Sequence, residues 1–274
     1  MPELPEAETI VRDLRPHLTG EVFAGAEVTH ADILGPGLTT QKLSHDVAGR
    51  RVDGVDRRGK NVVFRLAGGR VVAVNLGMTG RLVMSHAARA GELRHIAVRF
   101  PLEGGGALLF DDMRRFGRVD LFEAAGWRAR GEELGAEPLD DAFTAEHLRR
   151  LTRASRVPIR NFLLDQRKVA GVGNIYANEA LFLAGIRPTR RARTLTRAEI
   201  ERLHAGLRAV LEDAIAARGT TLRDYRDGSG AEGTYEPRLR VYDRAGASCP
   251  NCGSLIKRVV LTNRSAFYCP RCQR

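Results

Sequence analysis

Two Cys-x2-Cys pairs near the end of the chain limit its fold more than any other feature of the sequence. Cys249 and Cys252 are separated from Cys269 and Cys272 by 16 residues, and the chain has no other cysteine. This spacing is typical of four thiolates that bind one zinc ion, whereas a disulfide pair would require an oxidising compartment to which nothing in the sequence points. Four sulfur ligands leave no open coordination position, so the predicted zinc ion is structural.

The segment between the two pairs, SLIKRVVLTNRSAFY, predicts two strands joined by a turn at residues 262–264. Arg264 is then expected near the tip of a β-hairpin. A hairpin of this size buries little apolar surface of its own, so the metal is expected to supply its folding free energy.

The charge of the chain indicates the class of its partner. Its 274 residues carry a formal net charge of +11, which favours a polyanion, either nucleic acid or an anionic membrane. No apolar run approaches the ~20 residues of a membrane span, and the acidic N-terminus is unlike a signal peptide. We therefore expect a soluble, cytoplasmic protein that binds nucleic acid. Only Lys42, Lys60, Lys168 and Lys257 are lysines among 44 basic residues, so a lysine is a candidate for a position that needs a titratable cation.

The periodicity of apolar residues divides the chain into a β-rich and a helical part. A helix is predicted over residues 5–15, with Pro16 near its end, followed by short glycine-bounded strands typical of an antiparallel sandwich or barrel. Residues 124–141 are rich in Gly, Glu and Arg and are interpreted as a domain linker. The expected strands are 52–55, 61–66, 70–76, 95–100 and 118–122, with a hairpin turn at Gly68-Gly69, and the expected later helices are 144–151, 158–164, 174–183 and 197–217.

The first residues of the chain have the composition of a covalent catalytic site. If Met1 is trimmed, Pro2 becomes a free secondary amine, and an α-amine with a pKa near ~8 is partly neutral and nucleophilic at working pH. Glu3 and Glu6 place two carboxylates within reach to move protons. The structural alternative is a frayed terminus whose Glu3, Glu6 and Glu8 favour the positive end of a helix.

Three loops carry residues suited to nucleic acid. Lys60 lies at a turn before a strand and is either a solvated lysine or a cation aimed at a phosphate. Met78, between Gly77 and Gly80, and the Arg114–Phe116 loop could insert into a base stack, although a salt-bridged turn with one buried Phe is the alternative for the second.

Two further segments remain open to a structural and a functional interpretation. Residues 171–174 (GVGN) precede a helix, where exposed N–H groups favour a phosphate; Asn174 either binds it or caps the helix. The glycine-rich segment 227–235 is either a lid over substrate or a plain connector. The residues of interest in the lid are Gly228, Ser229, Gly230, Gly233 and Tyr235.

The motifs PELPE, GK, LGMTG, DDMRRFG and GVGNIYANEALF, followed by the four-cysteine hairpin, occur in this order. In this combination the chain closely resembles the formamidopyrimidine-DNA glycosylases of the Fpg/Nei family, nearly from end to end. The resemblance implies an α+β fold with an N-terminal helix and antiparallel β-sandwich, a helix–two-turn–helix domain and a zinc β-hairpin finger. The expected boundaries are 1–130, 131–236 (with the capping loop) and 237–274.

The resemblance also implies a function: a bifunctional DNA glycosylase and AP lyase that excises oxidised purines, 8-oxoguanine and formamidopyrimidines, from duplex DNA. The expected mechanism is a Schiff base with the N-terminal proline followed by β,δ-elimination. The protein is expected to be a monomer that holds one structural zinc ion and works at the nucleoid. The implied catalytic residues are Pro2, Glu3, Glu6, Lys60 and Arg264. The implied DNA-binding residues are Met78, Arg114, Phe116, Lys168, Asn174 and Arg264, and the loop around residues 227–235 closes over the damaged base.

The sequence departs from the family pattern at Arg167, where a lysine is common; arginine keeps the charge and changes the geometry. Leu4 and the Met78, Arg114 and Phe116 set favour the purine-lesion branch over the Nei-type enzymes that prefer oxidised pyrimidines. The alternatives are a Nei-type glycosylase and a non-catalytic zinc DNA-binding protein.

Overall fold

The computed structural model describes residues 2–87, 93–222 and 225–274. The chain forms two compact units, one of Met1–Glu133 with Ala217–Glu236 and the other of Leu134–Ala216 with Pro237–Arg274. Residues 217–236, which the sequence assigns to the helical domain, thus pack with the first unit. The reason is local: Thr220 and Gly228 donate backbone hydrogen bonds to Glu6 and Asp13 of the N-terminal helix.

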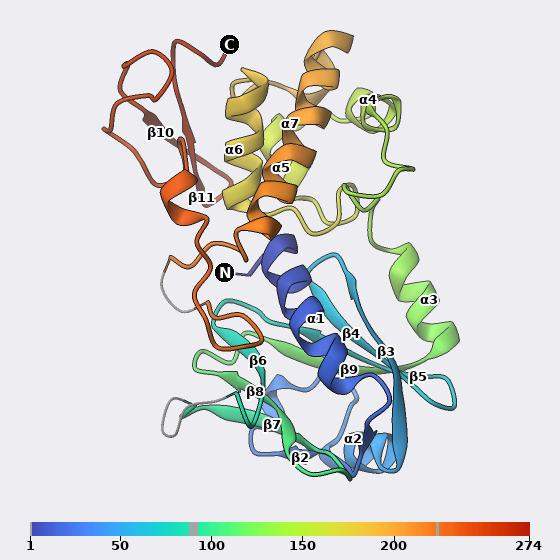
Figure 1. The fold of residues 1–274 in the computed structure, drawn as a ribbon. Coiled ribbons are helices and arrows are strands. Elements are labelled where there is room, and N and C mark those ends of the chain that lie inside the picture. The colour runs from blue at the N-terminus through green and yellow to red at the C-terminus, as the bar shows by residue number, and fades with distance from the viewer. Residues whose placement is uncertain (1, 88–92, 223–224) are drawn as a thin grey trace. The chain divides into compact units, whose positions relative to one another are not determined.

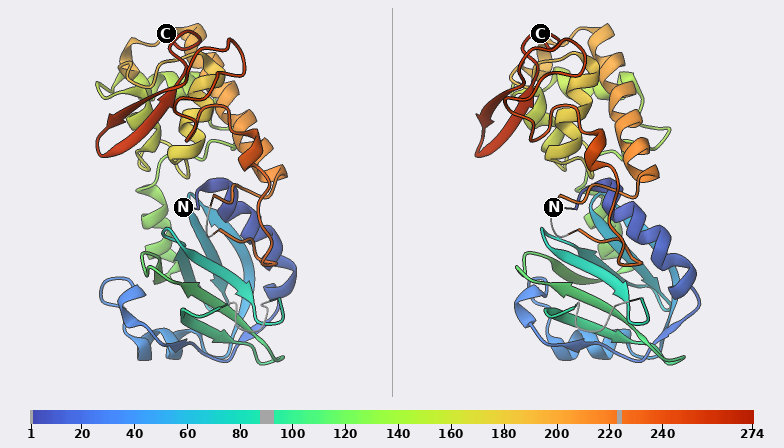
Figure 2. Two further views of the ribbon diagram at one scale, coloured as in Figure 1. Left: turned by 90° about the vertical axis from the view of Figure 1, so that its left-hand side faces the viewer. Right: turned by 60° about the vertical axis from the view of Figure 1, so that its left-hand side comes forward.

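The first unit is a sandwich of two antiparallel sheets with helix α1 (Leu4–Leu18) along it (Figures 1 and 2). One sheet has the order β1-β3-β4-β5-β9 and the other the order β2-β7-β8-β6. Phe23, Phe64, Phe100 and Phe110 from the two sheets form one core with the apolar face of α1. The strands are Val22–Phe23 (β1), Glu27–Val28 (β2), Arg50–Arg58 (β3), Asn61–Leu66 (β4), Arg70–Asn75 (β5), Gly80–Met84 (β6), Ile96–Pro101 (β7), Ala107–Asp112 (β8) and Arg118–Glu123 (β9), with helix α2 at Thr40–Val47. The predicted sandwich is confirmed.

One helix boundary differs from the predicted one, and one helix lies where a linker was expected. Helix α1 continues past Pro16 to Leu18, because Leu14 and Leu18 are fully buried and their packing outweighs the missing N–H of the proline. Residues 124–132, expected to be linker, form helix α3 (Ala124–Glu132), of which no residue is buried. The stretch therefore has helical backbone without an apolar face that periodicity could detect.

The second unit is helical and ends in the β-hairpin. Its helices are α4 (Ala145–Arg153), α5 (Ile159–Leu164), α6 (Asn174–Ala184) and α7 (Arg197–Ala216), and its strands are β10 (Lys257–Leu261) and β11 (Arg264–Tyr268). Thr262 and Asn263 both have positive φ, 46° and 62°, as a two-residue type I′ turn requires. Phe182 of α6 packs with Ile256 and Phe267 of the hairpin segment, so α6 lends the finger part of its core.

Glu179 of α6 fastens the segment that leads into the finger. Its carboxylate is fully buried and accepts hydrogen bonds from the backbone N–H groups of Arg240 (2.9 Å), Val241 (2.9 Å) and Tyr242 (2.8 Å). Burial raises the pKa of Glu179, and the three N–H donors oppose that shift. The sequence showed only a helical glutamate in this position.

We expect Glu179→Ala to be destabilising, because it leaves the buried N–H of Val241 without an acceptor, at about 1–3 kcal/mol, and removes the partner of the part-buried N–H groups of Arg240 and Tyr242. The unfolding midpoint should fall by at least about 2–4 °C per kcal/mol lost. Thermal unfolding by circular dichroism measures the change. Glu212→Ala, at an exposed position of α7, is the matched control and should leave the midpoint within about 1 °C.

None of the helices in the described ranges is long and apolar enough to cross a membrane.

Candidate functional site

The start of α1 brings two carboxylates against the beginning of the chain. Pro2 is buried, and Glu3 and Glu6 are each 1% exposed. Glu3 is the N-cap of α1 and Glu6 its third residue, and the two form a capping box in which each side chain accepts the backbone N–H of the other. This local pattern explains why acidic residues occupy both positions.

The two oxygens of Glu6 both serve the backbone. One accepts the N–H of Glu3 at 2.7 Å and the other the N–H of Thr220 at 2.8 Å. Gly219 has a φ of +85°, and a Cβ there would lie 2.9 Å from the Glu6 carboxylate, so only glycine allows this approach. Glu6 therefore holds the first turn of α1 to residues 219–220, and Glu3 is the better placed of the two to exchange a proton.

Tyr225 is buried near the Glu6 carboxylate, and its phenol stays protonated. Burial, followed by the Glu6 and Asp227 carboxylates, raises the pKa of the Tyr225 phenol well above its usual value.

The glycine-rich segment is fastened to α1 by charge. Arg218 donates to Asp227 at 2.7 Å through Nε and to Asp13 at 2.7 Å, and Gly228 N–H donates to the same Asp13 oxygen at 3.0 Å. Asp227 is fully buried and also accepts the backbone N–H and hydroxyl of Ser229.

The end of the segment is anchored separately. Tyr235 is fully buried, and Gly233 lies so close to the backbone of Gly219 that a Cβ would meet its oxygen at 2.2 Å. Ser229 is exposed, whereas Gly228 is buried. The part of the segment available to a ligand is therefore near residues 229–232.

Lys60 occupies a two-residue hairpin turn between β3 and β4. Gly59 precedes it with a φ of +59°, the conformation that a type II′ turn requires at its first central residue. Lys60 is half-buried. The tight turn fixes the backbone conformation at Lys60, which suits a cation that must contact one particular group of a ligand.

Met78, Arg114 and Phe116 are exposed side chains on two neighbouring loops. Met78 is 38% exposed and Phe116 58%, and the Arg114 guanidinium lies 4.6 Å from the centre of the Phe116 ring. The alternative of a buried Phe is thus wrong. Large apolar side chains held in water are costly unless a partner covers them.

A buried polar cluster joins these two loops. The Thr79 hydroxyl donates to Asp112, which also accepts Gly117 N–H at 2.7 Å, and Arg114 N–H donates to Thr79 Oγ1 at 3.1 Å. Asp112 is fully buried. Gly77 completes the contact, since a Cβ there would lie 2.4 Å from the backbone carbon of Phe116. The sequence analysis did not identify Thr79 and Asp112. Their positions in the two glycine-bounded loops that carry Met78 and Phe116 could have indicated them.

In the second unit, Asn174 connects the start of α6 to the hairpin. Gly173 is the N-cap, so the capping role for Asn174 is wrong. Its Oδ1 accepts from Arg160 at 2.7 Å and its Nδ2 donates to the Ser265 carbonyl at 3.0 Å. Arg160 is 1% exposed and also donates to the carbonyls of Leu261 and Ser265. This buried arginine, which sequence reasoning missed among so many others, holds Asn174 and the hairpin together.

A cavity of about 260 Å³ opens beside these residues. Its lining includes Arg160, Asn161, Thr262 and Arg264. Arg264 is exposed, and no hydrogen bond or ion pair engages its side chain within the described ranges. An unengaged guanidinium beside a small cavity is suited to a phosphate.

The loop before α6 is braced by Gln166 and Lys168. Gln166 donates to the Val172 carbonyl at 2.8 Å and accepts Gly171 N–H at 2.9 Å. Lys168 donates to the Ser155 hydroxyl at 3.3 Å, and its ammonium lies 5.1 Å from the centre of the Phe162 ring. Gln166 is another residue that the sequence did not single out.

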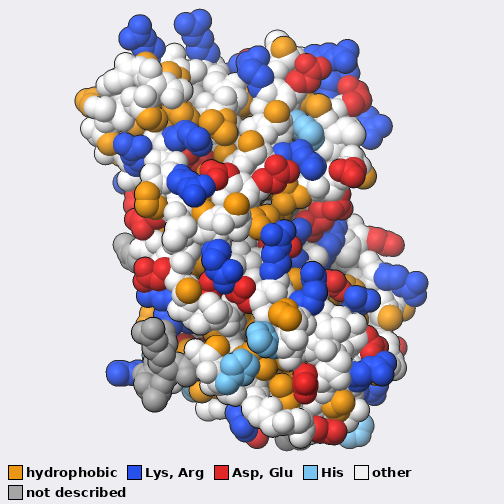
Figure 3. Space-filling model, in the orientation of Figure 1, with side chains coloured by type: hydrophobic (Ala, Val, Ile, Leu, Met, Phe, Trp, Pro, Cys, Tyr) orange, Lys and Arg blue, Asp and Glu red, His pale blue; other side chains and the backbone are white. Residues whose placement is uncertain are grey.

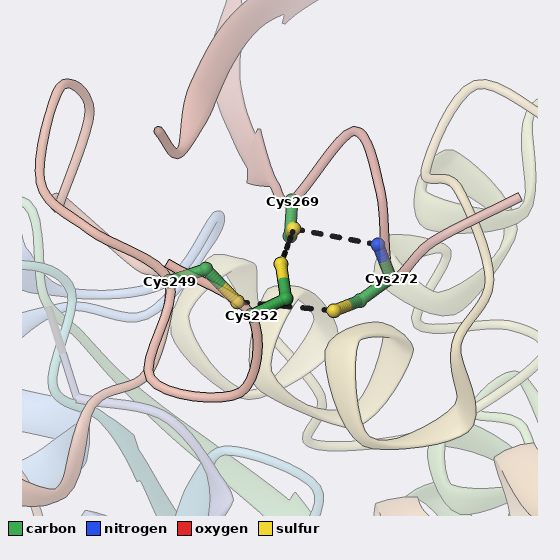
Figure 4. A group of neighbouring side chains, drawn as sticks. All are labelled: Cys249, Cys252, Cys269 and Cys272. Atoms are coloured by element: carbon green, nitrogen blue, oxygen red, sulfur yellow. Dashed lines mark hydrogen bonds between the residues drawn. The ribbon is translucent and has the colours of Figure 1, made fainter. Parts of the chain in front are cut away.

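The four cysteines converge as the spacing predicts (Figure 4). Their Sγ atoms all lie within 4.8 Å of one another, the compactness that a tetrahedral metal site needs. Burial and the neighbouring sulfurs raise the pKa of the Cys272 thiol to about 12, a penalty on ionisation that a dication removes. The donor set therefore fits one structural zinc ion.

Comparisons with known proteins agree with this arrangement. Family models match the formamidopyrimidine-DNA glycosylase N-terminal domain at residues 1–119, its H2TH domain at residues 134–226, and the zinc finger found in FPG and IleRS at residues 248–274. A formamidopyrimidine-DNA glycosylase of Chloroflexus aggregans is 44% identical over 274 residues, which cover 100% of this chain and 98% of the relative.

Two solved structures extend the likeness to three dimensions. The MutM (FPG) protein from Thermus thermophilus has a TM-score of 0.88 at 39% identity, covering 99% of this chain and 98% of that chain. Wild-type Fpg (MutM) of Lactococcus lactis, in complex with DNA that contains N7-benzyl-Fapy-dG, has a TM-score of 0.91 at 29% identity, covering 100% of both chains. The chain therefore belongs to the formamidopyrimidine-DNA glycosylase family.

Proposed function

We propose that this protein is a DNA glycosylase and AP lyase that removes oxidised purines, 8-oxoguanine and formamidopyrimidines, from duplex DNA. The observation that carries the proposal is the buried Pro2–Glu3–Glu6 cluster at the start of the chain. Family membership supports it, as does the relative whose complex contains a Fapy lesion. The protein acts as a monomer in the cytoplasm, at the nucleoid.

The chemistry begins once Met1 has been removed. The Pro2 nitrogen attacks C1′ of the damaged nucleotide, the bond from C1′ to the base breaks, and Glu3 transfers a proton in this step. The C1′–O4′ bond of the deoxyribose then breaks, O4′ takes up a proton, and the opened sugar is held as an iminium with Pro2. β-Elimination and then δ-elimination expel the two flanking phosphates, and hydrolysis of the iminium releases the amine. Glu6 keeps Glu3 and residues 219–220 in position throughout.

Exposed and half-buried side chains of the two units account for binding and extrusion. Met78, Arg114 and Phe116 fill the space that the extruded base leaves, at an unstacking cost of a few kcal/mol that the new contacts offset. Lys60, Lys168, Asn174 and Arg264 bind phosphates. The exposed Ser229 and half-buried Gly230 of segment 227–235 cover the base, with Gly228 holding the segment to α1. The zinc ion holds the hairpin without taking part in catalysis.

A panel of duplexes tests the substrate class. Single-turnover excision should be fast for 8-oxoguanine and Fapy-guanine and at least about tenfold slower for an oxidised pyrimidine, a difference of about 1.4 kcal/mol in activation free energy. The reverse order would identify a Nei-type enzyme, and no excision of any lesion would leave a DNA-binding protein.

We expect Thr79→Val to slow base extrusion. The change removes the hydroxyl between the two loops and leaves Arg114 N–H and Asp112 with one partner fewer, at about 1–3 kcal/mol. Excision of 8-oxoguanine should fall about tenfold, whereas cleavage of a preformed abasic site, which needs less unstacking, should fall less. Thr29→Val, at an exposed threonine of the same unit, is the control. An equal loss on both substrates would show that the cluster serves general stability and not the wedge.

A further inference from the structure

Five arginines of the second unit form a surface that the proposed site does not use. Arg150 and Arg153 lie in the last turn of α4, Arg156 follows it, and Arg191 and Arg193 lie at the start of the short 3-10 helix Ala192–Thr194. We call these five residues the arginine patch. All five side chains are exposed.

Backbone hydrogen bonds bring the segments of the patch together. Arg193 N–H donates to the Ser155 carbonyl at 3.1 Å and Ala192 N–H to the Val157 carbonyl at 2.9 Å. Arg150 and Arg153 are three residues apart and so share one face of α4. The five charges therefore belong to one continuous surface that rigid elements present.

The patch has no internal counter-charge. Within the described ranges, no hydrogen bond, ion pair or ring contact engages any of the five side chains. Nearby arginines behave differently: Arg149 pairs with Glu146 and Arg197 with Glu201. Basic and acidic side chains are likewise interspersed over the face drawn in Figure 3. An arginine-rich composition explains why these residues are arginines, but it does not explain why none of the five is paired with an acid such as Glu146, which binds Arg149 instead.

The patch adjoins the loop that precedes α6. Ser155, whose carbonyl binds Arg193, accepts the Lys168 ammonium on its hydroxyl at 3.3 Å. Lys168 is one of the residues proposed to bind a phosphate. Five like charges held on one surface repel one another, and a polyanion that continues past Lys168 relieves this repulsion.

We propose that the arginine patch binds the phosphate backbone of duplex DNA outside the lesion, extending the footprint that begins at Lys168. This inference rests on the proposed function for its choice of DNA as the polyanion. Contacts of this kind carry no sequence information. They raise the affinity for any duplex and leave the chemical step unchanged, so they serve the search for damage.

The test compares two triple variants on undamaged duplex. In Arg153→Gln/Arg156→Gln/Arg193→Gln, the slope of log affinity against log salt should become shallower by ~0.9 for each lost phosphate contact, or about 2.7 in all. Between 50 and 200 mM salt the variant should then lose about forty-fold less affinity than the parent. Arg149→Gln/Arg197→Gln/Arg238→Gln removes the same charge from arginines that are paired with acids and should change the slope much less.

Phosphate ethylation interference locates the contacts. The patch variant should lose interference at phosphates away from the lesion and keep it at those next to the lesion, with excision at saturating enzyme unchanged. An unchanged slope, an equal change in the control variant, or loss of interference only at the lesion would overturn the proposal. Because undamaged DNA is the ligand, failure here is distinct from failure of the glycosylase assignment, which the lesion panel reports.

Discussion

Extending the chain by two residues before Pro2 should abolish covalent trapping of damaged DNA by borohydride. The extension turns the Pro2 nitrogen into a tertiary amide, which has no available lone pair and cannot form an iminium. Excision should fall on the order of a thousandfold or more, the scale on which removal of a catalytic group acts. Pro2→Gly, which keeps an amine but loses the ring, should strongly reduce the trapped adduct. Gel analysis of borohydride-treated 8-oxoguanine duplex measures both.

The neighbouring carboxylates provide the controls for this experiment. Glu3→Gln should slow excision about 10²–10⁴-fold, the usual contribution of a general acid or base. Glu8 lies in the same helix but is committed elsewhere: burial would raise its pKa, yet its bonds to Arg12 and Arg57 lower the pKa of Glu8 overall. Glu8→Gln should therefore trap DNA as the parent does. Full activity in protein whose intact mass includes Met1 would remove Pro2 from the mechanism.

Removal of the zinc ion should unfold the finger and sharply weaken DNA binding. Structural zinc contributes about 10–16 kcal/mol in small finger peptides, far more than a short hairpin core can supply. The hairpin also provides Arg264 and the carbonyls that hold Arg160 and Asn174. One lost charge-assisted phosphate contact costs about 1.5–3 kcal/mol, so affinity should drop at least tenfold. Cys269→Ala should have the same effect as a chelator.

Native mass spectrometry and DNA titration measure these two effects on the same sample. Ser248→Ala, at an exposed position beside Cys249, should retain one zinc ion and full affinity. DNA affinity that stays at the parent value in fully metal-free protein would contradict a structural role for the ion.

Patterns that depend on neighbours in the chain were readable from the sequence. The Cys-x2-Cys pairs predicted the convergence of four sulfurs, and short β-like runs bounded by glycines predicted strands β4 and β5 at nearly their observed bounds. Helix α3 was missed because it buries no residue, and the end of α1 was placed too early because proline was given more weight than the buried Leu18. The periodicity of apolar residues indicates which face of an element is buried. It therefore fails to predict a helix, such as α3, that buries no face.

The sequence by itself determined the family, the zinc ligands and the candidate nucleophile, since each is a short motif whose chemistry is set by residue type and spacing. Only the tertiary structure decided what the polar residues do. In the structure, Glu6 accepts hydrogen bonds from two backbone N–H groups, and Thr79 and Asp112 join the two exposed loops. Asn174 binds Arg160 and does not cap the helix. Such roles depend on partners distant in the chain, because a buried polar group must find its hydrogen bonds wherever the fold places them.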